Sequence, residues 1–336
     1  MKLGIYSDLR NPAGWRRGWS RSYGRTLERV EEAERLGLGA AFFTEHHLFE
    51  DGYMPQPLTF AAAAAARTER IRIGTAVMLA TLRPAIDTAE QAAVVDILSG
   101  GRLELGLGTG YRVPEFEAFG VDMSRRYALL EERCEEIRRL WEGGRLSPPP
   151  VQERLPLWIG AEGPRGARLA GRVGAGLMTL RGDLLDAVRA GRAKAGDLAP
   201  VRLSGPVNLI LADDPERTWA ELEPFIVHQA QTYRAYGAEG KPDEEAEIAG
   251  KSINLDWLRS TGPEMNPPRI DVVTPAEAAR RMREWLGPLP VEYAFFWESI
   301  AGMPDVIADR HLELIGTDLA ALLEDDDGPP TDLSIV

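Results

Sequence analysis

The sequence predicts an α/β protein with the architecture of a (β/α)8 TIM barrel and a long insertion after the seventh strand. Short apolar runs alternate with longer amphipathic stretches almost from end to end, which is the pattern of parallel strands joined by helical crossovers. Eight such units fit within the 336 residues. This length and this number of units favour a closed barrel over an open, doubly wound sheet.

The expected strands are short runs rich in aliphatic and aromatic residues. In chain order they are Lys2–Tyr6, Ala40–Thr44, Ile71–Met78, Leu103–Gly108, Leu157–Ala161, Gly176–Leu180, Leu203–Leu211 and Glu292–Trp297. Each strand is followed by at least one stretch whose apolar residues recur at helical spacing. Gly37 is a candidate C-cap behind the first of these helices, and the second helix is rich in alanine. The expected helices are Tyr23–Leu36, Leu58–Arg67, Ile86–Leu98, Tyr127–Trp141, Arg165–Arg172, Leu184–Ala195, Trp219–Tyr236, Pro275–Leu286 and Asp305–Leu322.

We expect residues 1–322 to form a single domain. The segment 237–271 mixes Gly, Pro, Lys and Glu, which is typical of a surface loop. Because loops of this length are often functional, we interpret this segment as a lid over one face of the barrel. Residues 323–336 combine an acidic run with two prolines, which predicts a disordered tail.

The composition excludes several classes of protein. The chain has 39 Lys and Arg against 52 Asp and Glu, a net charge of −13, which argues against a general nucleic-acid partner because phosphates require a basic surface. Its single cysteine, Cys134, excludes an internal disulfide and a four-cysteine zinc site. No apolar run approaches the ~18 residues that span a bilayer, and the N-terminus lacks the apolar segment of a signal peptide. We therefore expect a cytoplasmic protein with no membrane partner.

In such a barrel the site is formed by residues just past the carboxyl ends of the strands. His46 and His47 follow the second strand beside Glu45. A neutral imidazole can take a proton from an oxygen or a hydroperoxide near pH 7, so the pair predicts an acid–base site. The alternative is a structural role, with one ring bonded to the backbone at the barrel rim and the other solvated. No metal site is expected, because adjacent strand residues face opposite ways and the other histidines, His228 and His311, lie in predicted helices.

Two glycine-containing turns follow further strands. The segment Gly100–Gly110 does not match the dinucleotide motif G-x-G-x-x-G, because Tyr111 stands where the third glycine would fall. We interpret this segment either as backbone that a ligand approaches closely or as a tight barrel corner. The turn Ala161–Pro164 leads from a strand into a helix, and the amides of a helix N-terminus can bind the phosphate of a cofactor. Its Gly-Pro pair is also consistent with simple helix initiation.

Five segments stand in the order and spacing of one known family. They are F-F-T-E-H-H-L-F (Phe42–Phe49), I-R-I-G-T-A-V (Ile71–Val77), L-S-G-G-R-L-E-L-G-L-G-T-G-Y (Leu98–Tyr111), E-F-E-A-F-G-V-D-M (Glu115–Met123) and W-I-G-A-E-G-P (Trp158–Pro164). On these segments the chain resembles the bacterial luciferase-like family of flavin-dependent monooxygenases. The resemblance covers most of the chain and is strongest over residues 38–140.

The resemblance implies an enzyme that binds reduced FMN at the carboxyl ends of its strands. A separate NAD(P)H-dependent reductase is expected to supply the flavin as a transient partner. Oxygen would add at flavin C4a, and the resulting peroxyflavin would oxygenate a small organic substrate. The resemblance also implies a homodimer formed through helices of the early β/α units, where Ala61–Ala66 is the one supporting run.

The resemblance assigns roles to individual residues. His46, with His47 beside it, corresponds to the catalytic acid–base. The segment Thr75-Ala76-Val77 corresponds to a strand bulge with a non-prolyl cis peptide that supports the isoalloxazine ring, and Glu115 corresponds to an acidic position near the flavin. The other expected cofactor-binding residues are Gly108, Thr109, Tyr111, Ala161, Glu162, Gly163 and Pro164.

The sequence departs from the family pattern in three places. The family often has an arginine at the position of Thr109, so Arg112 or Arg165 is expected to supply the charge for the FMN phosphate. Gly108 replaces the cysteine of light-emitting luciferases, which weakens an inference of bioluminescence. The turn Ala161–Pro164 looks more like the deazaflavin-dependent branch, whose members transfer a hydride without oxygen.

The sequence therefore predicts an FMN-dependent, two-component monooxygenase, because its E-H-H and G-T-A-V segments favour FMN. Two alternatives stay open, namely a deazaflavin-dependent hydride-transfer oxidoreductase and a non-catalytic luciferase-like partner subunit. The substrate does not follow from the sequence, because barrel loops set specificity and vary freely within one fold.

Overall fold

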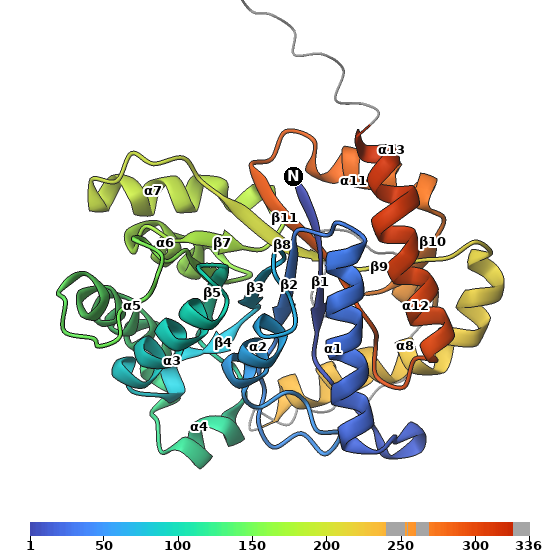
Figure 1. Ribbon diagram of the computed structural model, residues 1–336, viewed down its shortest axis with the longest axis horizontal. Helices are drawn as coiled ribbons and strands as arrows, with labels where there is room; N and C mark the ends of the chain where they lie inside the picture. The colour runs from blue at the N-terminus through green and yellow to red at the C-terminus, as the bar shows by residue number, and fades with distance from the viewer. Residues whose placement is uncertain (240–252, 254, 260–268, 325–336) are drawn as a thin grey trace, which may run out of the picture.

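The computed structural model describes residues 1–239, 253, 255–259 and 269–324. Within these residues, eight parallel strands close into a barrel that is surrounded by helices (Figure 1). The barrel strands are β1 (Lys2–Ser7), β2 (Ala40–Phe43), β3 (Arg72–Thr75) with its continuation β4 (Met78–Leu79), β5 (Leu103–Gly108), β6 (Leu157–Gly160), β7 (Gly176–Met178), β8 (Leu203–Val207) and β11 (Val291–Trp297). The circle closes because β1 pairs with β2 and β11, and β3 pairs with β2 and β5. The predicted (β/α)8 fold is confirmed.

Every expected helix is present, with its ends shifted by a few residues. The helices are α1 (Trp19–Arg35), α2 (Pro57–Ala65), α3 (Ala85–Leu98), α5 (Arg126–Glu142), α6 (Pro164–Arg172), α7 (Leu185–Ala195), α8 (Pro215–Ala238), α11 (Pro275–Leu286) and α12 (Asp305–Leu314), which continues through a π-helical turn (Ile315–Leu319) into α13 (Ala320–Glu324). Capping side chains explain two of the starts, because Asp214 accepts a hydrogen bond from the Arg217 N–H and Thr274 accepts one from the Glu277 N–H. In both cases a proline occupies the first helical turn.

Two α-helices and one strand among the described residues were not expected from the sequence. Helix α4 (Val113–Phe119) has a proline in its first turn and ends at Gly120, which has a φ of 66°. This proline-to-glycine pattern is a helix signature that the sequence contains. Helix α10 (Leu255–Arg259) falls within the expected insertion, and strand β10 (Asp271–Val273) begins at its last residue. Strand β10 pairs in parallel with β9 (Leu209–Leu211) outside the barrel.

Two of the expected strands are each divided into two shorter strands. The run Ile71–Met78 is interrupted by a cis peptide between Ala76 and Val77, and β4 resumes the pairing with β5 at Met78. The run Leu203–Leu211 divides into β8 in the barrel and β9 in the small sheet. Asn208 separates the two strands, but the sequence alone does not reveal that the chain leaves one sheet for another there, because both strands are largely buried.

Aromatic side chains fill the barrel interior. Phe42, Trp158 and Phe295 are completely or almost completely buried there, and Tyr293 packs against Phe42 and Trp158. Glu104 is buried among them, and its carboxylate accepts hydrogen bonds from Trp158 Nε1 at 2.7 Å and from the Tyr293 hydroxyl at 3.1 Å, and pairs with Arg72 Nε at 2.7 Å. This acid is satisfied by its neighbours and does not line the cavity described below.

A buried polar cluster fastens helix α8 to the barrel. Arg10, in the loop after β1, donates to Asp51 Oδ2 at 2.7 Å and to Gln229 Oε1 at 3.1 Å. Gln229 in turn donates to Asp8 at 2.9 Å. The cluster therefore ties α8 to the loops that follow β1 and β2, and it places Tyr233, one helical turn further on, beside the carboxyl ends of the strands.

Much of the expected lid lies outside the described residues. Of the segment 237–271, the structure describes 237–239, 253, 255–259 and 269–271. Residues 325–336 of the expected tail are also outside them, so the lid and the disordered tail stay predictions. Among the described helices, none combines the length and the apolar composition that crossing a bilayer requires.

Candidate functional site

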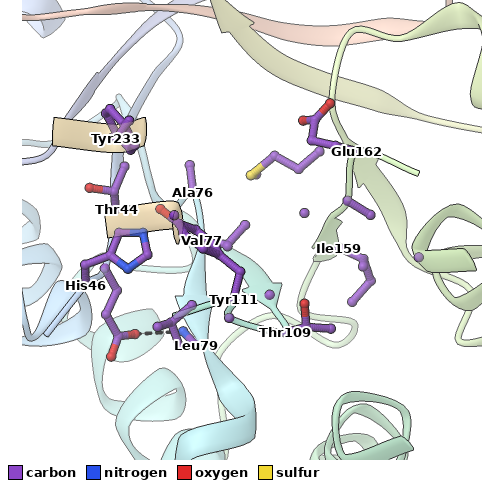
Figure 2. A pocket seen from close by; sticks show the side chains of 18 of the residues that line it. Thr44, His46, Ala76, Val77, Leu79, Thr109, Tyr111, Ile159, Glu162 and Tyr233 are labelled. Atoms are coloured by element: carbon purple, nitrogen blue, oxygen red, sulfur yellow. Dashed lines mark hydrogen bonds between the residues drawn. The ribbon is translucent and has the colours of Figure 1, made fainter. Parts of the chain in front are cut away.

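A cavity of about 720 Å³ lies at the carboxyl ends of the barrel strands. Its lining includes His46, Ala76, Val77, Gly108, Thr109, Tyr111, Ala161 and Glu162 from the predicted site. The remaining predicted residues, His47, Thr75, Glu115, Gly163 and Pro164, are not part of this lining and lie behind or beside it. Figure 2 places Thr44 and His46 on one side of the cavity and Glu162 on the other, with Ala76 and Val77 between them.

His46 is held in a fixed orientation at the cavity wall. Its Nδ1 lies 2.8 Å from Glu115 Oε1. Its ring stacks on Phe49 and meets the rings of Tyr53 and Tyr111 edge to face at centroid distances of 4.8 and 5.0 Å. Because Nδ1 is engaged, Nε2 is the ring nitrogen without a partner among the described residues. An ionised Glu115 places the hydrogen on Nδ1 and leaves Nε2 as a proton acceptor.

His47 takes a different position from its neighbour. Its Nε2 lies 2.6 Å from Glu45 Oε1, and its ring packs against Phe119. Its backbone N–H donates to the same Glu115 oxygen that holds His46, at 2.8 Å. Neither ring is solvated, since the two residues are only 6% and 8% exposed. The structure therefore brings His46 to the cavity and His47 to its supporting layer.

The peptide between Ala76 and Val77 forms the floor of the cavity and is cis, as the resemblance implies. The Val77 side chain lies across two glycines of the neighbouring strands. A Cβ at Gly108 would stand 2.4 Å from Val77 Cγ2, and one at Gly160 would stand 2.7 Å from Val77 Cγ1. Gly108 and Gly160 border the cavity, and because they have no side chains they leave room for Val77. The Val77 side chain is therefore wedged between β5 and β6.

The two arginines proposed to replace the family's phosphate-binding arginine differ in position. Arg112 is sandwiched between Phe49 and Tyr236, donates to the His47 carbonyl, and does not line the cavity. Arg165 lies at the start of α6, over the ring of Tyr127 at 4.1 Å. Arg165 does not line the cavity either, but Tyr127, over which it lies, does, so Arg165 is the better placed of the two.

Glu162 brings a titratable carboxyl to the cavity wall. Part of its side chain is accessible from the cavity, yet the surrounding protein excludes enough water for burial to raise its pKa to about 7, against the opposing effect of Arg181. Its Oε2 lies 3.4 Å from the Thr179 hydroxyl. The carboxyl therefore changes its charge near neutral pH.

Several residues of the cavity were not predicted from the sequence. Tyr53, Met178, Tyr233, Arg234 and Phe295 all contribute to its lining. Tyr233 and Arg234 come from the C-terminal part of the long helix α8, where no local motif marks them. Tyr53 and Tyr233 meet through their hydroxyls at 2.9 Å although 180 residues separate them. Only the folded chain brings such residues together.

The described residues do not include a cluster of three or more His, Cys, Asp or Glu side chains arranged to hold a metal ion. His228 and His311 lie in helices α8 and α12 as expected. His311 is a core residue whose Nδ1 accepts from the Leu211 N–H at 2.8 Å. Burial lowers the pKa of His311 to about 3, so the ring stays neutral.

Comparison with known proteins agrees with this geometry. Residues 1–287 match the luciferase-like monooxygenase family. The chain is 34% identical over 274 residues to an F420-dependent glucose-6-phosphate dehydrogenase of Kribbella flavida, a match covering 71% of this chain and 81% of that protein. It is 33% identical over 171 residues to the uncharacterised protein y4wF of Sinorhizobium fredii, covering 46% of this chain and half of that protein.

A solved structure extends the likeness over nearly the whole chain. The monooxygenase RslO1 from Streptomyces bottropensis superimposes with a TM-score of 0.76 and 25% sequence identity, covering 96% of this chain and 99% of that one. The family match, the barrel and the arrangement of E-H-H beside the cis peptide all agree. The chain belongs to the luciferase-like monooxygenase family, whose members named here are oxidoreductases.

Proposed function

We propose that this protein is an FMN-dependent, two-component monooxygenase that uses reduced flavin and oxygen to oxygenate a small organic substrate. The observation that carries the proposal is the position of His46, which presents Nε2 to a cavity floored by the Ala76–Val77 peptide. Among the described lining residues, Arg234 is the single guanidinium or ammonium group, against two carboxylates, Glu45 and Glu162. This balance favours FMN over a deazaflavin coenzyme whose side chain ends in several carboxylates.

The residues present fit a flavin. The cavity volume lies within the range of pockets that enclose cofactors, about 300–1,000 Å³. Ala76, Val77 and Ile159 offer an apolar surface for a flat ring system. Gly163 precedes α6 without a capping side chain, and no atom lies within 4 Å of the position of its missing Cβ. The first amides of α6 are therefore open to a phosphate, with Thr109 and Arg165 nearby.

The chain's own part in the reaction is to bind, orient and move protons. When bound, reduced flavin would supply the two electrons that divide O2 between the substrate and water. Glu115 fixes the His46 ring, and His46 Nε2 can then take a proton from the reacting oxygen or return one. The rings of Phe49, Tyr53 and Tyr111 pack against the His46 ring and limit the access of water to it.

A deazaflavin-dependent hydride-transfer oxidoreductase is the second candidate. The F420-dependent relative named above and the Ala161–Pro164 turn favour it. The test is a competitive titration of the purified protein with FMN and coenzyme F420, followed by measurement of oxygen consumption with a panel of small organic substrates. We expect FMN to displace F420, and we expect substrate-dependent oxygen uptake with reduced FMN. Tighter binding of F420, with hydride transfer in the absence of oxygen, would establish the second candidate. Failure to bind either coenzyme would favour the non-catalytic partner subunit.

FMN affinity is expected to fall as the pH rises through 7. Below this pH the Glu162 carboxyl is neutral because its pKa is raised to about 7. Above it, the ionised carboxylate repels a phosphate that carries nearly two negative charges. We expect the Kd for FMN to increase about threefold to tenfold between pH 6.5 and 8.5, measured by fluorescence titration. Glu162→Gln should remove this dependence.

The matched control for Glu162→Gln is Asp186→Asn, which also removes one carboxylate. Asp186 is 92% exposed on helix α7 and pairs with Arg189. The control is expected to keep the wild-type pH dependence. An unchanged pH dependence in Glu162→Gln would mean that the phosphate lies away from this carboxyl.

We also propose a homodimer formed through α3, with the flavin reductase as a transient partner. Ile86, Val94, Ile97 and Leu98 lie on α3 with 41%, 47%, 38% and 53% of their surfaces exposed. A second copy of this face would cover them. In sedimentation experiments, Val94→Glu is expected to shift a dimer to a monomer. Val306→Glu, at an isolated valine that is 75% exposed on α12, should leave the dimer intact.

A further inference from the structure

One carboxylate joins the two halves of the candidate site. Glu45 follows β2 and is only 2% exposed. Its Oε1 lies 2.6 Å from His47 Nε2 and 2.6 Å from an Arg83 guanidinium nitrogen. Its Oε2 accepts a hydrogen bond from the Leu79 N–H at 2.7 Å, which Figure 2 shows as a dashed line at Leu79. Three separate groups from the chain thus converge on one buried carboxylate.

One of these contacts leads to the floor of the cavity. Leu79 belongs to β4, two residues after the cis peptide between Ala76 and Val77. The hydrogen bond from its N–H to Glu45 therefore fixes the backbone on which we place the flavin ring. A buried carboxylate bound by backbone and charged donors is held firmly, because charge-assisted hydrogen bonds are shorter and stronger than neutral ones.

The other contact leads to the proposed base. Glu45 fixes the ring of His47, and the His47 N–H donates to Glu115 Oε1, the oxygen that holds His46 Nδ1. A continuous set of contacts therefore runs from the cavity floor through Glu45, His47 and Glu115 to His46. Glu45 does not itself reach the unpartnered nitrogen of His46, so it can act on the chemistry only through these neighbours.

We propose that Glu45 is a positioning residue that sets the distance and angle between the flavin-bearing peptide and the His46 base. This inference rests on the proposed function for its effect on catalysis, but its effect on His46 exists in the protein without cofactor. The reach of the side chain is the property that matters, since one carboxylate must span from Leu79 to His47. A purely stabilising role for Glu45 would instead depend on its burial and charge.

Two substitutions separate reach from charge. Glu45→Asp keeps the charge and shortens the side chain by one methylene, so the carboxylate cannot hold Leu79 and His47 together. Glu45→Gln keeps the length, and its amide can accept from the Leu79 N–H while donating to the other tautomer of His47. It gives up only the contact with Arg83, because an amide NH2 cannot accept from a guanidinium. If Glu45 acts through its reach, Glu45→Gln should resemble the wild type more closely than Glu45→Asp does.

The matched control is Glu104→Asp at the barrel interior. Glu104 is 4% exposed and, like Glu45, is held by three partners, but it does not line the cavity. Both shortened variants leave buried donors unsatisfied and should lose stability to a similar degree. Glu45→Asp and Glu104→Asp are therefore compared under conditions in which equal fractions of both proteins are folded. Their loss of stability then does not account for a difference between them.

The experiment follows His46 by NMR in the full-length protein without cofactor, and FMN binding and turnover in parallel. In Glu45→Asp we expect the ring-nitrogen chemical shifts of His46 to differ from those of the wild type, because the Glu115 oxygen that holds Nδ1 is no longer fixed through His47. We also expect kcat to fall about tenfold or more, the range typical of lost supporting contacts, with the Kd for FMN changed less than threefold. Glu104→Asp should leave the His46 ring-nitrogen chemical shifts unchanged.

Two results would overturn the inference. One is a set of His46 ring-nitrogen chemical shifts in Glu45→Asp that matches the wild type. The other is a larger disturbance in Glu45→Gln than in Glu45→Asp, which would assign the effect to charge. If the protein showed no FMN-dependent turnover at all, the proposed function would fail, while the NMR comparison in the cofactor-free protein would still decide the role of Glu45.

Discussion

Replacement of His46 by alanine is expected to slow substrate-dependent oxygen consumption with reduced FMN by about two to four orders of magnitude, the usual contribution of a general acid or base. The reason is that His46 Nε2 is the nitrogen presented to the cavity, while Nδ1 is held by Glu115 at 2.8 Å. The variant loses the proton acceptor but keeps the cavity floor and the start of α6. FMN should therefore bind with an affinity within a few-fold of the wild type.

Two further variants make this test specific. His46→Asn can still donate to Glu115 but cannot exchange a proton near pH 7, so it should be nearly as slow as His46→Ala. His228→Gln replaces a histidine that lies 3.7 Å from Asp51 and does not line the cavity. It should keep the wild-type rate. A His46→Ala protein that retained more than a tenth of the wild-type rate would show that another group moves the proton.

Replacement of Gly106 by alanine is expected to have the largest effect on folding. A Cβ at this position in β5 would lie 2.0 Å from the Thr75 carbonyl oxygen, which is backbone of β3 and cannot swing aside. The two strands would have to separate where Thr75 also exchanges hydrogen bonds with Gly106. We expect the free energy of unfolding to fall by about 3 kcal/mol or more, measured by urea unfolding.

The control for this variant has the opposite expected sign. Gly24 lies inside α1, and no atom lies within 4 Å of the position of its missing Cβ. Gly24→Ala should raise the free energy of unfolding by about 0.5–1 kcal/mol, because glycine is a weak helix former. A loss below about 1 kcal/mol in Gly106→Ala would mean that the barrel relaxes at this contact more readily than its geometry indicates.

Much of the fold follows from the sequence because each β/α unit carries its own periodicity. The unit from Ala40 to Ala65 is an example, since its apolar strand and alanine-rich helix are both read locally. The sequence did not predict that β9 pairs in the small sheet instead of in the barrel, because its partner strand Asp271–Val273 is distant in sequence. Helix α4 was missed although Pro114 and Gly120 mark its two ends.

The candidate site is a harder problem because adjacency in sequence does not reveal orientation. His46 and His47 are neighbours in E-H-H, and nothing local tells which ring meets the cavity. The answer depends on Glu115, which is 69 residues from His46 and reaches both histidines from α4. The cis peptide at Ala76–Val77 came from family resemblance and not from local physical chemistry, since neither residue favours that geometry.

The wedge formed by Val77 has an evolutionary consequence. Because its side chain occupies the space that side chains at Gly108 and Gly160 would need, neither glycine can gain a side chain while position 77 keeps its valine. A larger residue on either strand becomes tolerable only after position 77 has become smaller, so the order in which substitutions arise matters. Positions 77, 108 and 160 should therefore covary as one inherited unit, and reshaping this floor by laboratory evolution calls for libraries that vary all three together.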